Sequence, residues 1–143
     1  YDELLSCIKN FVKVFLNIKG RENRSSDILN RLEEITKYIE DNLQTVNLTI
    51  LANKFYFNPS YLSRIFKQHK KTNIINYINK IKLEKAKEYL KNTDKTIKEI
   101  THDLGFKSTV YFSRFFKDNA KISPTGYREK HGITGNDKRI YAN

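Results

Sequence analysis

Apolar side chains recur along this chain at the spacing of an α-helix. Leu62, Ile65 and Phe66 follow one another at i, i+3 and i+4, which places them on one face of a helix. The same spacing returns fifty residues later, at Phe112, Phe115 and Phe116. The whole chain has only 2 prolines and 5 glycines, too few for the many turns of a β protein. The pattern therefore predicts an all-α fold.

A long connector helix is predicted between these two stripes. Residues 73–92 keep helical spacing and contain neither proline nor glycine. We expect its first half to pack on the preceding unit and its second half on the following one. The apolar positions concerned are Ile74, Ile78 and Ile81, and then Leu83, Ala86 and Leu90. Twenty residues at about 1.5 Å each make a rod of about 30 Å, close to the roughly 34 Å between successive major grooves on one face of B-DNA.

The first stripe belongs to a helix-turn-helix pattern. A short apolar run, which we expect to begin as a helix at Thr49, precedes the sequence Asn58-Pro59. Proline suits the first position of a helix, so Asn58 is a good N-cap for the helix that follows. Two short helices separated by a tight turn are therefore predicted.

The second stripe follows the same plan. Thr96 is expected to cap a short helix, and Gly105 to end it at the position that favours left-handed dihedrals. Ser108 or Thr109 then caps the next helix. The second helix-turn-helix unit is thus predicted from its own caps, independently of the first.

The two units are also alike in sequence. Residues 61–67 read YLSRIFK and residues 111–117 read YFSRFFK, identical at five of seven positions. Such a repeat indicates a duplicated supersecondary unit. The outward stripes are Ser60, Ser63, Arg64 and Lys67 in the first copy, and Thr109, Val110, Ser113, Arg114 and Lys117 in the second. A helix that presents an arginine and small polar groups suits the major groove, because arginine donates two hydrogen bonds to guanine.

The charge distribution points to a polyanionic partner. The chain has 27 Lys+Arg and 16 Asp+Glu, a formal net charge of +11. Residues 45–130 hold 18 of these basic and 7 of these acidic groups, so the whole excess lies there and the rest is neutral. The basic groups are interleaved with apolar ones at helical spacing. A folded basic surface is therefore expected, and nucleic acid is favoured over an anionic membrane.

The N-terminal part predicts two more helices. Apolar positions between residues 4 and 16 form an amphipathic stripe that needs a partner. A break is expected at 20–26, after which Ser26 or Asp27 caps a second helix. Its apolar positions are Leu29, Leu32, Ile35, Ile39 and Leu43.

The organisation expected from these elements has four segments. Residues 1–26 form an amphipathic helix and linker from an upstream region, and 27–81 form the first helix-turn-helix subdomain. Residues 82–131 form the second subdomain, and 132–143 a flexible tail. Because the chain begins at Tyr1 and not at methionine, we expect it to be part of a longer protein.

No pattern for catalysis or metal binding stands out. The single cysteine, Cys7, lies on an apolar stripe, and none of the 3 histidines has a second ligand at i+3 or i+4. Adjacent carboxylates such as those of Glu33 and Glu34 lie on solvated helix faces. No segment has the roughly 18–20 apolar residues that span a bilayer. We therefore expect no catalytic residues, no metal and no cofactor.

The chain resembles the AraC/XylS family of transcription regulators over about residues 31–130. The resemblance rests on TIKEITHDLGFKSTVYFSRFFKDNAKISPTGYREKHG (96–132), with the family's GF, YFSRFFK, SP and YR in order, and on LTILANKFYFNPSYLSRIFKQHKKT (48–72). It implies two helix-turn-helix subdomains joined by a long helix that bind promoter DNA. The chain departs from the family's glycine at Lys71 and Lys121, from its alanine at Thr101 and from its arginine at Lys82.

Candidate contacts with DNA follow from the outward stripes and the resemblance together. The base-reading candidates carried over by position are Ser60, Ser63, Arg64, Thr109, Val110, Ser113 and Arg114. The phosphate-binding candidates are Thr49, Asn58, Tyr61, Lys67, Lys70, Lys71, Thr96, Lys107, Ser108, Tyr111 and Lys117. Thr49 and Thr96 are included as helix N-termini, where backbone amides attract anions.

The expected function is that of a bacterial, cytoplasmic regulator associated with the nucleoid, which binds double-stranded promoter DNA in a sequence-specific manner. RNA polymerase is a further possible partner, and residues 4–16 are a possible surface for self-association or for a sensor domain. The alternative is an architectural protein that binds nucleic acid without regard to sequence. A DNA-repair methyltransferase, which would need an activated cysteine, and a module that only contacts other proteins are weaker alternatives.

Overall fold

The computed structural model describes Ile8, Val12 and residues 25–132. The chain divides into two compact units, residues 1–37 and residues 38–143. Of the amphipathic helix predicted within residues 1–19, the structure describes Ile8 and Val12, which are helical and exposed. The rest of that helix and the tail from residue 133 onward lie outside the described residues.

In the first unit, residues 25–37 are helical. Ser26 and Asp27 lie inside this helix, so the prediction that one of them caps it is wrong. Serine and aspartate are tolerated within a helix at well under 1 kcal/mol each, and their presence alone does not mark a helix end. Leu32 and Ile35 are buried as expected, whereas Leu29 is 44% exposed.

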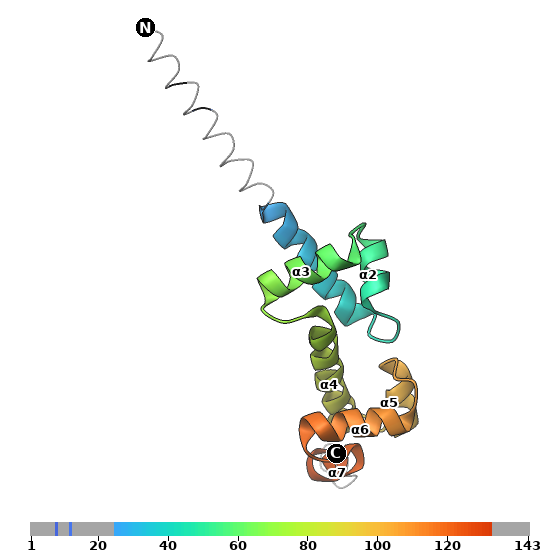
Figure 1. The fold of residues 1–143 in the computed structure, drawn as a ribbon. Coiled ribbons are helices and arrows are strands. Elements are labelled where there is room, and N and C mark those ends of the chain that lie inside the picture. The colour runs from blue at the N-terminus through green and yellow to red at the C-terminus, as the bar shows by residue number, and fades with distance from the viewer. Residues whose placement is uncertain (1–7, 9–11, 13–24, 133–143) are drawn as a thin grey trace, which may run out of the picture. The chain divides into compact units, whose positions relative to one another are not determined.

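The second unit contains six labelled helices among its described residues (Figure 1). They are α2 (Leu48–Lys54), α3 (Pro59–Lys70), α4 (Ile74–Asn92), α5 (Ile97–Asp103), α6 (Thr109–Ala120) and α7 (Pro124–His131). Every regular element that the structure describes is a helix, which confirms the all-α prediction.

The helices form two helix-turn-helix units, one at each end of α4. Helix α2 packs on α3, α5 packs on α6, and α7 packs on α4. In Figure 1, α3 and α6 cross the view in a similar direction, and α4 runs between them. At 19 residues, α4 is about 28 Å long, as predicted for the connector.

Capping side chains define the helix starts. The side chain of Asn58 accepts hydrogen bonds from the backbone amides of Ser60 and Tyr61, and Pro59 occupies the first helical position. Asn73 caps α4 in a similar way, through the amide of Asn76. The predicted caps at Thr96 and Ser108 are confirmed as well.

The start of α2 differs from the prediction. Asn47, and not Thr49, is its N-cap, because the Asn47 side chain accepts the hydrogen bond from the amide of Ile50. Thr49 is therefore the second residue of the helix. Asparagine in extended backbone is a stronger cap than threonine, and it lies two residues earlier.

Each helix-turn-helix unit has its own aromatic core. Phe66 and Phe112 are fully buried, and Phe66 makes an edge contact with Tyr77 at 5.4 Å between ring centroids. Phe116 and Tyr127 form the equivalent pair in the second helix-turn-helix unit, with 5.5 Å between ring centroids. Three positions expected in the core are only half-buried, namely Ile81, Leu83 and Phe115.

The two recognition-type helices end in left-handed backbone at non-glycine residues. Lys71 has φ 59° after α3, and Lys121 has φ 62° after α6. This left-handed geometry, for which glycine is the usual residue at a helix end, is thus adopted by lysine, at about 1–2 kcal/mol of strain per residue. Each ammonium group donates a hydrogen bond to a carbonyl of the last helical turn, at Gln68 and Asp118.

We expect Lys121→Gly to raise the free energy of unfolding by up to about 1 kcal/mol, because glycine removes the left-handed strain. Lys117→Gly is the matched control: it removes the same charge from the same helix at an ordinary helical position, and should lower the stability by about 1 kcal/mol. Denaturant unfolding compares the two variants. A loss of stability in Lys121→Gly would contradict the strain argument.

Candidate nucleic-acid interface

The predicted base-reading residues lie on the outward sides of α3 and α6. On α3, Ser60 and Arg64 are exposed and Ser63 is half-buried. On α6 the equivalent set is Thr109, Val110, Ser113 and Arg114, of which only Ser113 is half-buried. Val110 is 71% exposed, although an apolar side chain gains by burial. Each helix thus presents its own stripe, and the two helices lie at the two ends of α4 (Figure 1).

Tyrosines border both stripes at equivalent positions. The ring of Tyr61 lies 6.0 Å from that of Phe57, and the ring of Tyr111 lies 6.1 Å from that of Phe106. The Arg64 guanidinium lies 5.4 Å from the Tyr61 ring, a cation–π arrangement that limits its rotamers. An arginine held in this way loses less conformational freedom when it binds a base.

The lysines among the phosphate candidates differ in exposure and in whether their ammonium groups are already hydrogen-bonded. Lys67, Lys107 and Lys117 are exposed. Lys70 is half-buried, and the ammonium of Lys71 is hydrogen-bonded to its own helix. Lys67 and Lys117 therefore have the freest charges next to the outward stripes.

Among the capping candidates, the cap oxygens are occupied. At the start of α3, Asn58 accepts hydrogen bonds from the amides of Ser60 and Tyr61, and Pro59 has no N–H, so the first turn has no amide left for a phosphate. At the start of α6, Ser108 accepts from the amide of Tyr111, which leaves the amides of Thr109 and Val110 as the groups that can donate to a phosphate. At α5, Thr96 forms a capping box with Glu99. The hydrogen bonds from Thr96 lower the pKa of the Glu99 carboxyl, which keeps it charged at the place where a phosphate would approach.

Three further basic side chains make contacts within the fold. Lys95 forms an ion pair with Asp103, which lowers the pKa of that carboxyl and raises the pKa of the lysine. Lys82 lies 5.1 Å from the Phe106 ring, and burial lowers the pKa of its ammonium. Arg128 donates hydrogen bonds to the backbone carbonyls of Leu90 and Lys95, so it fixes α7 to the end of α4 and the segment that follows.

The outward faces also contain a pair that the sequence reasoning did not select. Gln68 on α3 and Asp118 on α6 are equivalent and exposed, one helical turn beyond Arg64 and Arg114. Glutamine recognises adenine in the major groove and aspartate accepts from cytosine. The i+4 spacing from each arginine was the signal that could have identified them.

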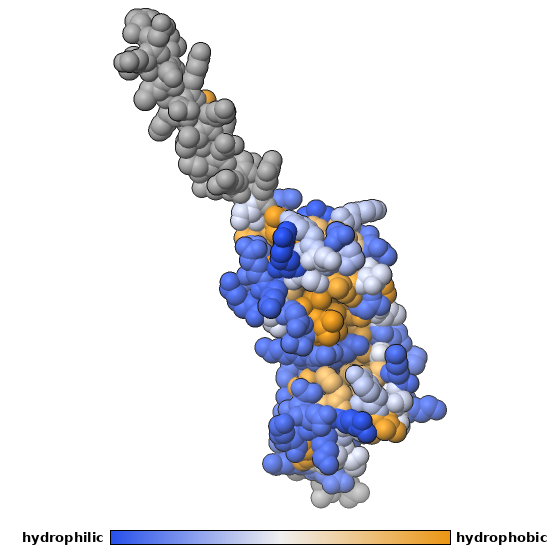
Figure 2. Space-filling view, viewed as in Figure 1, coloured by the Kyte–Doolittle hydropathy of each residue, from blue (hydrophilic) through white to orange (hydrophobic). Residues whose placement is uncertain are grey.

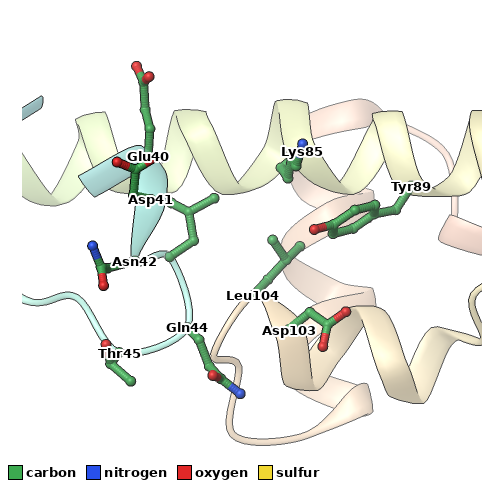
Figure 3. Close-up of a pocket in the computed structure, with 10 residues that line it drawn as sticks. Glu40, Asp41, Asn42, Gln44, Thr45, Lys85, Tyr89, Asp103 and Leu104 are labelled. Atoms are coloured by element: carbon green, nitrogen blue, oxygen red, sulfur yellow. The ribbon is translucent and has the colours of Figure 1, made fainter. Parts of the chain in front are cut away.

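The described residues hold no group of three or more His, Cys, Asp or Glu side chains that could bind a metal ion. Cys7 is outside them. Across the same residues, no helix is both long and apolar enough to cross a bilayer. A polar groove lies beside α4, and Figure 3 shows its lining. Its charged residues are Glu40, Asp41, Lys85 and Asp103.

The sequence was compared with known proteins. The profile of a helix-turn-helix domain family matches residues 51–130. The protein YijO of Escherichia coli strain K12, described as an uncharacterized HTH-type transcriptional regulator, is 35% identical over 100 residues. This match covers 69% of the present chain and 35% of YijO, so the chain spans about a third of that relative.

Two other matches extend the comparison. AdaA of Bacillus subtilis strain 168, described as a bifunctional transcriptional activator and DNA repair enzyme, is 31% identical over 96 residues, which cover 66% of this chain and 46% of AdaA. Among solved structures, the C-terminal domain of AraT, a response regulator from Geobacillus stearothermophilus, superposes with a TM-score of 0.70 at 30% identity. That alignment covers 79% of this chain and 91% of the AraT domain.

Proposed function

The chain belongs to the helix-turn-helix family of the AraC/XylS-type transcription regulators, and from this premise we propose that it is the DNA-binding region of a sequence-specific regulator. The observation that carries the proposal is the repeated stripe. Two helices at opposite ends of α4 present an exposed arginine with small polar neighbours, on a block of the chain with a net charge of +11.

The proposed mode of binding places α3 and α6 in successive major-groove segments of promoter DNA. Arg64 and Arg114 donate two hydrogen bonds each to guanine, and the Ser and Thr side chains of both stripes contact neighbouring base edges. Lys67 and Lys117, with the backbone amides of Thr109 and Val110 in the first turn of α6, hold the flanking phosphates. The length of α4 supports this arrangement, because about 28 Å of helix is close to the roughly 34 Å between successive grooves.

For the organisation of the chain we propose subdomains at 27–81 and 82–131, joined by the connector helix. This division is supported by the helix caps at Asn58, Thr96 and Ser108 and by the separate aromatic cores of the two helix-turn-helix units. Residues 1–26 are proposed to lead from an upstream region, with residues 4–16 as a surface for self-association or for a sensor domain. RNA polymerase is proposed as a further partner.

We also infer that the chain is not itself an enzyme. The relatives it matches are named as transcription regulators, and the match to the bifunctional AdaA covers 46% of that protein. A methyl-transfer assay on alkylated DNA tests this inference directly. Because the proposed target is bacterial promoter DNA, the site of action is the cytoplasm, at the nucleoid.

The test is selection of bound sequences from a random duplex pool at about 0.15 M salt, where phosphate contacts alone give weak binding. We expect two short conserved boxes about one helical turn apart. Their recovery would distinguish this function from an architectural protein. Binding without enrichment, with an affinity that depends only on salt, would support the architectural alternative.

A further inference from the structure

One side of α4 carries a set of polar side chains that the proposed function does not use. Asn76, Asn79 and Lys80 line an open groove between α4 and α6, together with Leu83, Phe115 and Asn119. The three α4 residues lie within four positions of one another, so they share one face of that helix. We refer to Asn76, Asn79 and Lys80 as the connector stripe.

The connector stripe has unused hydrogen-bonding capacity. Among the described residues, no hydrogen bond or ion pair engages the side chains of Asn76, Asn79 or Lys80, whereas the Asn119 amide donates to the Phe115 carbonyl. Two other lysines of α4 are paired with carboxylates, since Lys85 pairs with Glu88 and Lys87 with Glu84, each at 2.9 Å. Lys80 is exposed. The stripe thus offers amide and ammonium donors to an external acceptor.

The two sides of α4 differ in charge. No carboxylate lines the groove of the connector stripe. The groove that contains Lys85 and Tyr89 is lined by the carboxylates of Glu40, Asp41 and Asp103 (Figure 3). Asn76 and Lys85 are nine residues apart, which is two and a half helical turns, so they point to opposite sides of α4. A polyanion is attracted to the first side and repelled from the second.

The connector stripe also lies at the right level along the molecule. Its residues belong to the first half of α4, and the groove reaches α6 through Phe115 and Asn119. Figure 2, drawn from the same side as Figure 1, shows a band of hydrophilic side chains between hydrophobic patches over α4, between α3 and α6. On B-DNA, the minor groove and its two phosphate strands lie between successive major-groove segments on one face.

We propose that Asn76, Asn79 and Lys80 form a third DNA contact, which binds the phosphates that border the minor groove between the two major-groove segments. The inference rests on the proposed function and adds to it a contact from the connector helix itself. Lys80 neutralises one phosphate, and the two asparagine amides donate hydrogen bonds to phosphate oxygens.

The first experiment measures the affinity of the chain for its selected duplex across a range of salt concentrations. Lys80→Ala is expected to reduce the slope of log K against log[salt] by about 0.9, the value for one lost phosphate contact, and to weaken binding about fivefold at 0.15 M salt. Lys85→Ala is the matched control, because it removes the same charge from the opposite side of α4. An equal slope for wild type and Lys80→Ala would overturn the proposal.

A second variant separates DNA binding from folding. Asn76 is in the first turn of α4, where a carboxylate interacts favourably with the positive end of the helix. Asn76→Asp should therefore keep the melting temperature of the wild type, yet weaken DNA binding by repelling phosphate. Unchanged binding by Asn76→Asp would contradict the proposal.

The position of the contact is tested on the DNA. In a duplex with uncharged methylphosphonates at the phosphates between the two boxes, wild type and Lys80→Ala should bind with the same affinity. A persisting difference would place the contact of Lys80 elsewhere and overturn the proposal. If the wild-type chain selects no sequence at all, the proposed function fails first, and this outcome is distinct from failure of the connector contact.

Discussion

Gly105→Ala is expected to lower the free energy of unfolding by about 3 kcal/mol. Gly105 has φ +70°, which alanine adopts at a cost of about 1–2 kcal/mol. A Cβ atom at this position would lie 2.0 Å from the Gln44 carbonyl oxygen, so the backbone of one segment must shift, at a further 1–3 kcal/mol. Chemical denaturation followed by circular dichroism measures the change.

The first helix-turn-helix unit contains the control for this substitution. Tyr56 occupies the equivalent turn with φ 57°, but its side chain is 92% exposed. Tyr56→Ala keeps the left-handed strain without adding a clash and should change the stability by less than about 1 kcal/mol, whereas Tyr56→Gly should stabilise the chain. Similar losses for Gly105→Ala and Tyr56→Ala would show that the close approach to Gln44 does not matter.

Arg114→Ala is expected to weaken binding to the selected duplex by about 1–3 kcal/mol and to leave binding to random DNA nearly unchanged. The Arg114 side chain is exposed on the outward stripe of α6, where an arginine can reach guanine O6 and N7. Loss of a base contact lowers the affinity only where that base is present. Competition binding with selected and random duplexes measures the ratio.

Lys117→Ala is the matched comparison, three residues further along the same helix. As a phosphate contact it should weaken binding to both duplexes by a similar factor and reduce the salt slope by about one. An equal loss on both duplexes for Arg114→Ala would refute its base-reading role. A selective loss for Lys117→Ala would exchange the roles of the two residues.

The helices were predictable because their signals are local. The spacing of Phe112 and Phe116, the Asn58-Pro59 cap and the absence of breakers from 73–92 each act within a few turns of helix. The predicted left-handed turn at Gly105 is confirmed for the same reason. The error at Thr49 arose because several polar residues in a row could cap, and a sequence does not say which of them leaves helical dihedrals first.

The tertiary contacts were not predictable from the same signals. The approach of Gly105 to Gln44 joins positions 61 residues apart, and the hydrogen bond between Gln44 and His102 joins positions 58 apart. Phe115 follows the spacing of a buried stripe, yet it is only half-buried against Phe106, with 5.0 Å between ring centroids. These outcomes depend on how distant segments and neighbouring helices pack together, which periodicity does not contain.

In the candidate site, too, some features follow from the local sequence and others depend on tertiary contacts. The outward stripes with Arg64 and Arg114 could be assigned from the repeat, because helical periodicity decides which side of α3 and α6 is exposed. The ion pair of Lys95 with Asp103 and the carboxylate-free groove along Asn76 and Lys80 could not, since both depend on contacts between helices. Which bases the stripes prefer stays a prediction for the selection experiment.

Because the connector helix is uninterrupted, its length sets both the distance and the rotation between the two helix-turn-helix units. One residue inserted into α4 would move the second helix-turn-helix unit away from the first by about 1.5 Å and turn it by about 100°. One base pair inserted between two DNA boxes moves them apart by about 3.4 Å and turns them by about 35°. These two steps have no small common multiple. In the proposed mode of binding, a lengthened connector therefore cannot compensate for a lengthened spacer.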